Sequence, residues 1–356
     1  MHKADRRQFL AGAAGIVFTT CGALRAQSHA AGRGRRVTVG GRRVKTVDFH
    51  AHCGVPEAME LMGRRLQPQD PLVMGPNRLA AMDQQGIDVQ ALSINPYWYS
   101  AERDLVRQII TIQNEKLSAL CGAQPDRFVA FASVALQYPE LAAEQLELAE
   151  KKLGLRGAAI GGNVNGEELS LPKYHPFWAK AEELGVPVLI HPQANSQGIP
   201  DLQKRLRGNG LLNNVIGNPL ETTIALSHLI FEGTLDRFPA LKICAVHGGG
   251  FLPSYAGRSD HGCLTFPAEC DPTPLKKHPS EYLRQLYFDA LVFTPEGLRH
   301  LVAECGASQI VLGTDYPFPW TNTPVDHVLA TPSLNNAERR AILGETACKL
   351  LKIPMV

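Results

Sequence analysis

The sequence predicts a single α/β domain, folded as a distorted (β/α)8 barrel over residues 46–353. Short, apolar, β-branched segments alternate with helical patterns along the chain, and this alternation is typical of a parallel sheet. About 300 residues remain after an unusual N-terminal segment, which suits one such barrel. The alternative, an open doubly wound sheet, normally carries a glycine-rich phosphate loop after its first strand, and "HAHCGVPEA" is no such loop.

Eight segments have the length and the β-branched residues of strands. In chain order they are "VKTVDFHAH", "VQALSIN", "RFVAFASVAL", "LRGAAIGGNV", "VPVLIHPQ", "LKICAVHGGG", "QLYFDALV" and "QIVLGTDYP". The helical patterns are "NRLAAMDQQG", "ERDLVRQIITIQNEKLSALCGA", "PELAAEQLELAEKKLG", "HPFWAKAEELG", "ETTIALSHLIFEGTLDRF", "PSEYLRQ", "TPEGLRHLVAECG" and "NNAERRAILGETACKLL". The longest insertions follow strands one, five and six, at residues 53–76, 192–219 and 248–280. Loops in these places form the catalytic face of such a barrel.

Residues 1–30 have the layout of an export signal. Basic residues come first, a short stretch rich in alanine and glycine follows, and cleavage after Ala26 or Ala30 fits the small residues there. The apolar stretch is too short to cross a bilayer, so we expect no transmembrane segment in the mature protein. The pair Arg6-Arg7 before "QFL" resembles the twin-arginine type of signal. We therefore expect a periplasmic protein; a frayed basic N-terminus is the alternative.

The composition is globular, with 44% hydrophobic and 20% charged residues. The net charge is +2 and no dense basic block follows residue 45, so nucleic-acid binding has no electrostatic support. Of the eight cysteines, Cys21 lies in the signal, and the remaining seven contain no CxxC pair that would indicate a thiolate zinc site. Cys263 and Cys270 share one loop and can pair in an oxidising compartment.

Residues with metal-binding or acid–base chemistry fall at the carboxyl ends of the predicted strands. His50 and His52 end the first strand, His191 the fifth, His247 the sixth and Asp315 the eighth. In a barrel these strand ends meet at one mouth, where catalytic residues lie. A lone histidine in such a place is usually a solvated or hydrogen-bonded residue, so the joint pattern carries the prediction.

The spacing of the strand-end residues favours one metal ion. Residues i and i+2 of a strand point to the same side, so His50 and His52 can face one ion. With His191 and Asp315 they supply three imidazoles and one carboxylate, a set that suits Zn²⁺, the ion we expect, and also Mn²⁺. Strand four, "RGAAIGGNV", offers no bridging ligand for a second ion. His247 is then free to act as an acid–base group.

The motifs "DFHAH", "IHP", "HGGG" and "GTDYPF", in this order, resemble the amidohydrolase superfamily. They look most like the branch of amino-carboxymuconate-semialdehyde decarboxylase and the resorcylate-type decarboxylases. The resemblance runs from about residue 46 to the C-terminus. It implies a distorted barrel with one divalent metal held by His50, His52, His191 and Asp315. It also implies that the histidine of "HGGG" is catalytic.

The resemblance extends to substrate binding. Arg258 matches an arginine that reaches the substrate carboxylate of a neighbouring subunit, which implies a homodimer or a higher homo-oligomer. An ion pair on a helix surface is the alternative for this residue. The chain departs from the semialdehyde enzyme at Gln193, where that enzyme has an aromatic residue. Arg64, Arg65 and Arg78 are candidates for its other carboxylate-binding arginines.

We therefore expect a mononuclear metal-dependent decarboxylase that acts on a small carboxylated aromatic or dienoic acid. His247 would move the proton, and Asp315 could pass it in a resorcylate-type variant. The alternative is a hydrolase that opens a lactone or an amide with the same site. A third hypothesis is an exported binding protein that keeps the barrel without turnover.

Overall fold

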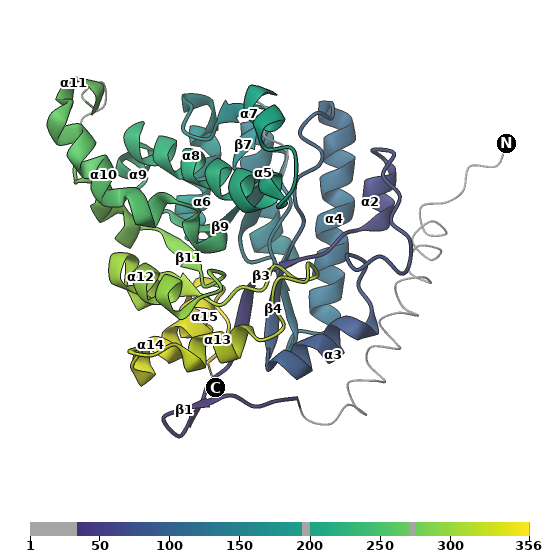
Figure 1. Cartoon of the computed structure of the whole chain (residues 1–356). Coiled ribbons are helices and arrows are strands. Elements are labelled where there is room, and N and C mark those ends of the chain that lie inside the picture. The colour runs from purple at the N-terminus through teal and green to yellow at the C-terminus, as the bar shows by residue number, and fades with distance from the viewer. Residues whose placement is uncertain (1–33, 194–199, 271–274, 356) are drawn as a thin grey trace.

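The computed structural model describes residues 34–193, 200–270 and 275–355. The predicted signal, residues 1–30, lies outside this part of the chain. Within it, parallel strands form the wall of a barrel, paired in the orders β3-β4-β5 and β12-β11-β10-β9-β6 (Figure 1). Single parallel bridges join the two sheets, from Ala132 to Ala158 and from Asp48 to Leu312. The ring therefore closes, and the predicted α/β barrel is confirmed.

Each strand of the wall falls on a segment that the sequence predicts as a strand. The strands are β3 (Val47–His52), β4 (Val89–Ser93), β5 (Phe128–Ala130), β6 (Ala158–Gly161), β9 (Pro187–His191), β10 (Lys242–Ala245), β11 (Tyr287–Asp289) and β12 (Ile310–Val311). Two short antiparallel hairpins lie outside the wall: β1 (Thr38–Val39) with β2 (Arg42–Arg43), and β7 (Asn163–Val164) with β8 (Glu167–Glu168).

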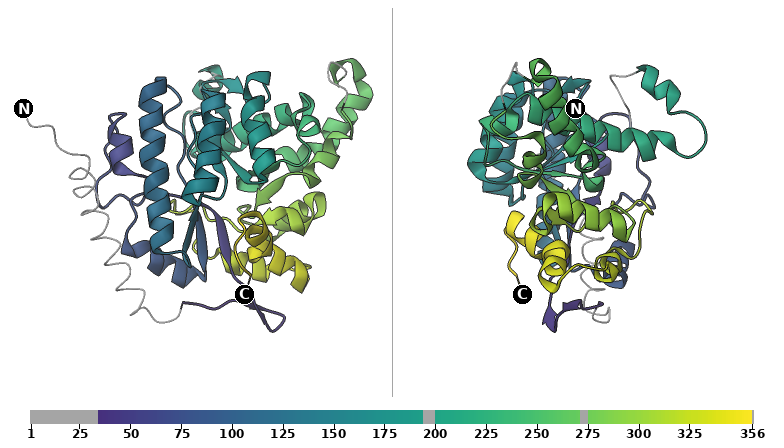
Figure 2. Two further views of the ribbon diagram at one scale, coloured as in Figure 1. Left: turned by 180° about the vertical axis from the view of Figure 1, so that it is seen from behind. Right: turned by 60° about the vertical axis from the view of Figure 1, so that its left-hand side comes forward.

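Helices cover the outside of the barrel (Figures 1 and 2). The predicted ones form as α3 (Pro76–Gln85), α4 (Arg103–Ala123), α5 (Pro139–Leu153), α6 (His175–Leu184), α8 (Asn218–Phe231), α9 (Thr234–Arg237) and α12 (Pro295–Cys305). Additional short helices are α2 (Pro56–Glu60), α7 (Pro200–Arg205) and α13 (Pro324–Ala330). The predicted helix "PSEYLRQ" is a 3₁₀ helix, Pro279–Arg284. In the described ranges no helix combines the length and the apolar character needed to cross a membrane.

The insertion after strand six forms an arm that the sequence patterns did not predict. It consists of α10 (Leu252–Thr265) and α11 (Pro267–Cys270), which project from the body of the barrel in Figure 1 and in the left view of Figure 2. Cys263 and Cys270 form a disulfide that ties the end of α10 to α11. The sequence allowed a disulfide between these two cysteines, and the structure contains it.

The predicted C-terminal helix is interrupted in its middle. It begins as α14 (Asn336–Arg340), widens to a π-helical turn over Ala341–Glu345, and ends as α15 (Thr346–Leu350). Gly344 lies in this turn, where a Cβ atom would collide with the carbonyl oxygen of Lys45. The close approach of the two backbones requires glycine here.

Apolar side chains pack on both sides of the wall. A larger buried cluster lies between the strands and the outer helices, and it includes Trp98 and Trp178, which have no exposed surface. A smaller cluster draws Phe49, Phe131 and Leu189 from the wall and Leu351 from the end of α15, so it fills the barrel interior. Apolar packing therefore leaves the carboxyl ends of the strands for polar groups.

Candidate metal centre and active site

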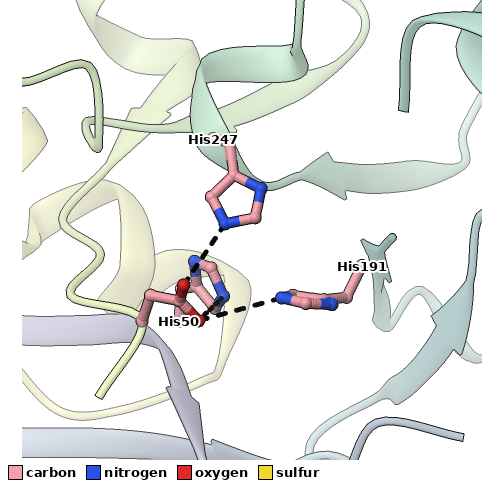
Figure 3. Close-up of side chains that lie close together, drawn as sticks. His50, His191 and His247 are labelled. Carbon is pink, nitrogen blue, oxygen red and sulfur yellow. Dashed lines mark ion pairs between the residues drawn. The ribbon is translucent and has the colours of Figure 1, made fainter. Parts of the chain in front are cut away.

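The structure brings the predicted strand-end residues together at the mouth of the barrel. His50 and His52 end β3, His191 ends β9, His247 starts the turn after β10, and Asp315 follows β12. Figure 3 shows the imidazoles of His50, His191 and His247 facing one another. The side chains of His50, His52, His191 and Asp315 are nearly or fully buried, and His247 has the most exposed side chain of the five, at 16%.

Asp315 lies at the centre of the cluster. Its Oδ1 is 2.9 Å from His52 Nε2, 3.2 Å from His50 Nε2 and 3.8 Å from His191 Nε2. Its Oδ2 is 3.5 Å from His247 Nε2. The Nε2 atoms of His50 and His52 are 3.1 Å apart, so the two imidazoles do face the same point.

Hydrogen bonds on the far side of the rings orient the two histidines of β3. His50 Nδ1 is 2.7 Å from the carboxylate of Asp289 and donates to it. His52 Nδ1 is 2.9 Å from the hydroxyl of Ser93, whose own proton goes to a backbone carbonyl. Because both Nδ1 atoms then carry the proton, both Nε2 atoms present lone pairs to the cluster.

The other two histidines differ from each other. His191 Nδ1 lies 2.6 Å from the carbonyl oxygen of Pro192, so this ring also presents an Nε2 lone pair. That Nε2 is buried and has no hydrogen-bond partner among the described residues. His247 Nδ1 likewise lacks a partner in the part of the chain that the structure describes. Three imidazoles are therefore held in place by a second hydrogen bond, and His247 is not.

Asp289 is a site residue that the sequence interpretation missed. It ends β11 and is fully buried. Its Oδ2 accepts from His50, while its Oδ1 accepts from the backbone N–H groups of Gly248, at 2.9 Å, and Leu291, at 3.1 Å. A carboxylate behind a ligating histidine fixes the ring and raises its basicity. The available signal was an aspartate at the end of "QLYFD", on the same rim as the other strand ends.

The arrangement of these atoms fits a bound cation. Lone pairs of His50, His52 and His191 and the carboxylate of Asp315 converge, and such acceptors repel unless a proton or a metal ion lies between them. One group among the described residues has the mutual distances of a metal site: ligand atoms of His50, His191, His247 and Asp315 all lie within 4.8 Å of one another. This group shares three members with the predicted ligand set and has His247 in place of His52.

The electrostatics of the cluster also call for positive charge. Burial alone would lower the pKa of His50, but Asp315 and Asp289 outweigh it and raise that pKa to about 10. Burial, with His52 nearby, lowers the pKa of His191 to about 3. Burial would raise the pKa of Asp315, yet the imidazoles around it hold that pKa well below its usual range. The second proton that His50 then carries, on Nε2, faces Asp315, and a divalent ion can replace it.

Two residues of the cluster have strained backbones. His247 has φ of 54° and Asp315 has φ of 59°, in the left-handed region that side chains with a Cβ rarely adopt. Such a conformation costs about 1–2 kcal/mol per residue. Strain of this kind persists where the surrounding structure enforces it, commonly at functional sites.

A cavity of about 760 Å³ opens next to the cluster. It has aromatic and amide side chains in its wall, and Arg64 is the one arginine or lysine among its described lining residues. The guanidinium of Arg64 lies over the ring of Tyr97 at 5.3 Å. Its lining includes His52, Tyr97, Tyr99, His191, Gln193, Asp315, Phe318 and Trp320. The space and its lining suit a small ring with polar substituents.

The end of β6, the fourth strand of the barrel wall, is closed to a further metal ligand. A Cβ atom on Gly161 would collide with the side-chain amide of Gln193, so that amide covers the strand end. The carboxylate of Glu221 accepts a hydrogen bond from the backbone N–H of Gln193 at 3.1 Å and so helps to fix Gln193 in this position. Burial raises the pKa of Glu221 to about 7. The place from which a bridging ligand would come is therefore filled, which fits one ion.

The four arginines that the sequence offered for substrate binding differ in their positions relative to the cavity. Arg64 lines the cavity, whereas Arg65 is exposed and pairs with Glu60. Arg78 is 2% exposed and lies behind the wall, away from the cavity. Arg258 is exposed on the projecting α10. Of these four arginines, Arg64 is the one that lines the described cavity.

A closed parallel barrel with histidines and an aspartate gathered at its mouth defines the class of (β/α)8 barrels that carry a metal site. The chain belongs to the amidohydrolase family, whose model matches residues 47–353.

Curated relatives of the chain are decarboxylases by name. It is 30% identical over 314 residues to 2-amino-3-carboxymuconate-6-semialdehyde decarboxylase of Dictyostelium discoideum, covering 86% of this chain and 84% of the relative. It is 31% identical over 333 residues to gamma-resorcylate decarboxylase of a Rhizobium species, covering 86% and 98%. A solved dihydroxybenzoic acid decarboxylase from Polaromonas, with bound manganese and the inhibitor 2-nitroresorcinol, superposes with a TM-score of 0.76 at 26% identity, covering 87% and 97%.

Proposed function

We propose that the protein is a mononuclear, metal-dependent decarboxylase of a small carboxylated aromatic or dienoic acid. The observation that carries the proposal is the convergence of three oriented imidazole lone pairs and one carboxylate beside a cavity of about 760 Å³. The names of the relatives support the reaction, since they act on carboxylated rings or on a carboxylated muconate semialdehyde.

We assign the metal to His50, His52, His191 and Asp315. The three histidines have their Nδ1 atoms held by Asp289, Ser93 and Pro192, as ligating histidines usually do. Zinc, expected from the ligand types, and manganese, bound in the Polaromonas relative, both suit this set. Elemental analysis of the purified protein distinguishes them. When bound, the ion supplies positive charge that orients the substrate and polarises one of its oxygens.

We assign proton transfer to His247. Loss of CO₂ breaks a carbon–carbon bond and leaves the electron pair on the substrate carbon, which must then take up a proton. His247 has the freest ring of the four histidines, because its Nδ1 has no hydrogen-bond partner among the described residues. Its Nε2 lies 3.5 Å from Asp315 Oδ2, so the carboxylate can orient the ring or pass the proton.

Substrate recognition follows from the cavity. Tyr97, Phe318 and Trp320 provide aromatic surface for a flat substrate, and Arg64 provides a cation for a carboxylate. We also propose a homodimer in which Arg258 reaches the partner's site. Tyr255 and Leu264 on the same arm are 58% and 70% exposed, which gives the arm apolar surface to bury.

A substrate panel tests the reaction. We expect metal-loaded protein to release CO₂ from at least one acid among 2,6-dihydroxybenzoate, 5-carboxyvanillate and related aromatic or dienoic acids. The matched control is the same protein after chelation, which should release none. A holoprotein that only opens lactones or amides, with no CO₂ from any acid, contradicts the decarboxylase and supports the hydrolase.

We further propose export to the periplasm by the twin-arginine-type signal at residues 1–30. The disulfide between Cys263 and Cys270 supports an oxidising compartment. This export route fits a protein that takes up its metal before transport. Cell fractionation should find the mature, metal-loaded chain in the periplasm, and a mature chain found only in the cytoplasm contradicts export.

A further inference from the structure

Arg78 is a buried cation that the proposed reaction does not use. Its side chain is 2% exposed and comes from α3, on the outer side of the barrel wall. Nη2 donates to the carbonyl oxygen of His52 at 2.5 Å, and Nη1 donates to Gln90 Oε1 at 3.1 Å. The guanidinium also lies over the ring of Tyr316, at 4.5 Å from its centre. Arg78 thus contacts the backbone of one proposed ligand and the residue next to another.

Gln90 links Arg78 to the buried carboxylate of Asp48 by hydrogen bonds. Its Nε2 donates to Asp48 Oδ2 at 2.9 Å, and both side chains have at most 1% exposure. Asp48 Oδ2 also accepts from the hydroxyl of Thr314 at 2.6 Å. The cation of Arg78 and the anion of Asp48 are therefore joined through one glutamine, and neither charge is left without partners.

The other oxygen of Asp48 lies at an irregularity in the wall. The pairing of β3 with β4 shifts register between Asp48 and Ala51, a segment that contains His50 and directly precedes His52. Asp48 Oδ1 accepts from the backbone N–H of His50 at 3.2 Å and of Thr314 at 3.1 Å. A bulge of this kind redirects the side chains that follow it, and its backbone donors need other partners.

We propose that Arg78, Gln90 and Asp48 form a buried positioning network that holds the end of β3 and the segment after β12, which carry the proposed ligands, in place. The network fixes the bulge at its start through Asp48 and at its end through the contact of Arg78 with His52. It reaches the segment after β12 through Thr314 and Tyr316, on either side of Asp315. The inference rests on the proposed metal site, because it concerns the geometry of that site.

The test compares Arg78 with Arg127, a second arginine that contacts α3 but lies outside the network. Arg78→Met removes the charge and both donors, and we expect it to weaken Mn²⁺ binding about 10–100-fold. The control is Arg127→Met, because Arg127 pairs with Asp83 on the same α3 and donates to Asp88 O, away from the site. We expect the control to lose thermal stability while its Mn²⁺ affinity stays within about twofold of the wild type. Chelator competition measures the affinity, and the Mn²⁺ EPR spectrum reports the ligand geometry.

Gln90→Met is the second variant, which keeps both charges and cuts the link between them. It should weaken Mn²⁺ binding about tenfold and broaden the EPR spectrum, even if Arg78→Met fails to fold. Wild-type Mn²⁺ affinity and spectrum in Gln90→Met, or in a folded Arg78→Met, overturn the network alone. A wild-type protein that binds neither Mn²⁺ nor Zn²⁺ overturns the metal site, and the network with it.

Discussion

His247→Asn is expected to slow decarboxylation about 10²–10⁴-fold while the protein binds as much metal as the wild type. Asparagine is similar in size and can hydrogen bond to Asp315, but it cannot exchange a proton near neutral pH. Steady-state CO₂ release and metal analysis of the same preparation measure the two quantities.

The control for this variant is His300→Asn, on the outer helix α12, where the imidazole is exposed and contacts Ser254. It should keep wild-type turnover. Unchanged turnover in His247→Asn would contradict the assignment of proton transfer. If the wild type binds acids but shows no turnover at all, the chain is a binding protein.

Removal of the metal is expected to abolish turnover, and replacement of a ligand should prevent reloading. His52→Ala leaves the proposed site with three ligands, so its affinity should fall by more than the 10–100-fold typical of a supporting residue. Bound metal also stabilises the fold, by about 2.7 kcal/mol at a hundred times its dissociation constant. Chelation of the wild type should therefore lower the melting temperature, and added Mn²⁺ or Zn²⁺ should restore it.

The metal contents of His52→Ala and His247→Asn together show whether His52 or His247 is the fourth metal ligand. The group of described residues whose ligand atoms all lie within 4.8 Å of one another contains His247, whereas the ring orientations favour His52. Metal loss in His52→Ala together with full metal in His247→Asn supports the proposed set. The reverse pattern makes His247 the ligand and His52 the acid–base group.

The barrel and the cluster at its mouth could be predicted because both have local signals. A strand in a parallel barrel is a short apolar run, and its carboxyl end points to the site, so His191 and Asp315 could be placed from their neighbours alone. Asp289 has the same position, but its strand continues into the apolar "ALV", which hides the strand end. The hydrogen bonds at Nδ1 that orient the ligand histidines join residues of different strands, and no local sequence pattern reveals such contacts.

Other features depend on how segments approach one another. The register shift in β3 begins at Asp48, which accepts hydrogen bonds from Thr314 where the barrel closes, although the two residues are 266 positions apart in sequence. Arg78 was a candidate for substrate binding because an arginine near the first loop suits a carboxylate. Its burial follows from the face of α3 that packs on the wall, and this face is set by tertiary structure.

The left-handed backbones of His247 and Asp315 have a consequence for the evolution of the protein. At these two positions glycine would relieve about 1 kcal/mol of strain each, so selection for heat resistance alone would favour losing both side chains. Selection for catalysis opposes this, because the same conformations direct the imidazole and the carboxylate into the proposed active site. A variant library screened only for folding should therefore accumulate inactive survivors at positions 247 and 315, and thermostable enzymes must gain their stability elsewhere in the barrel.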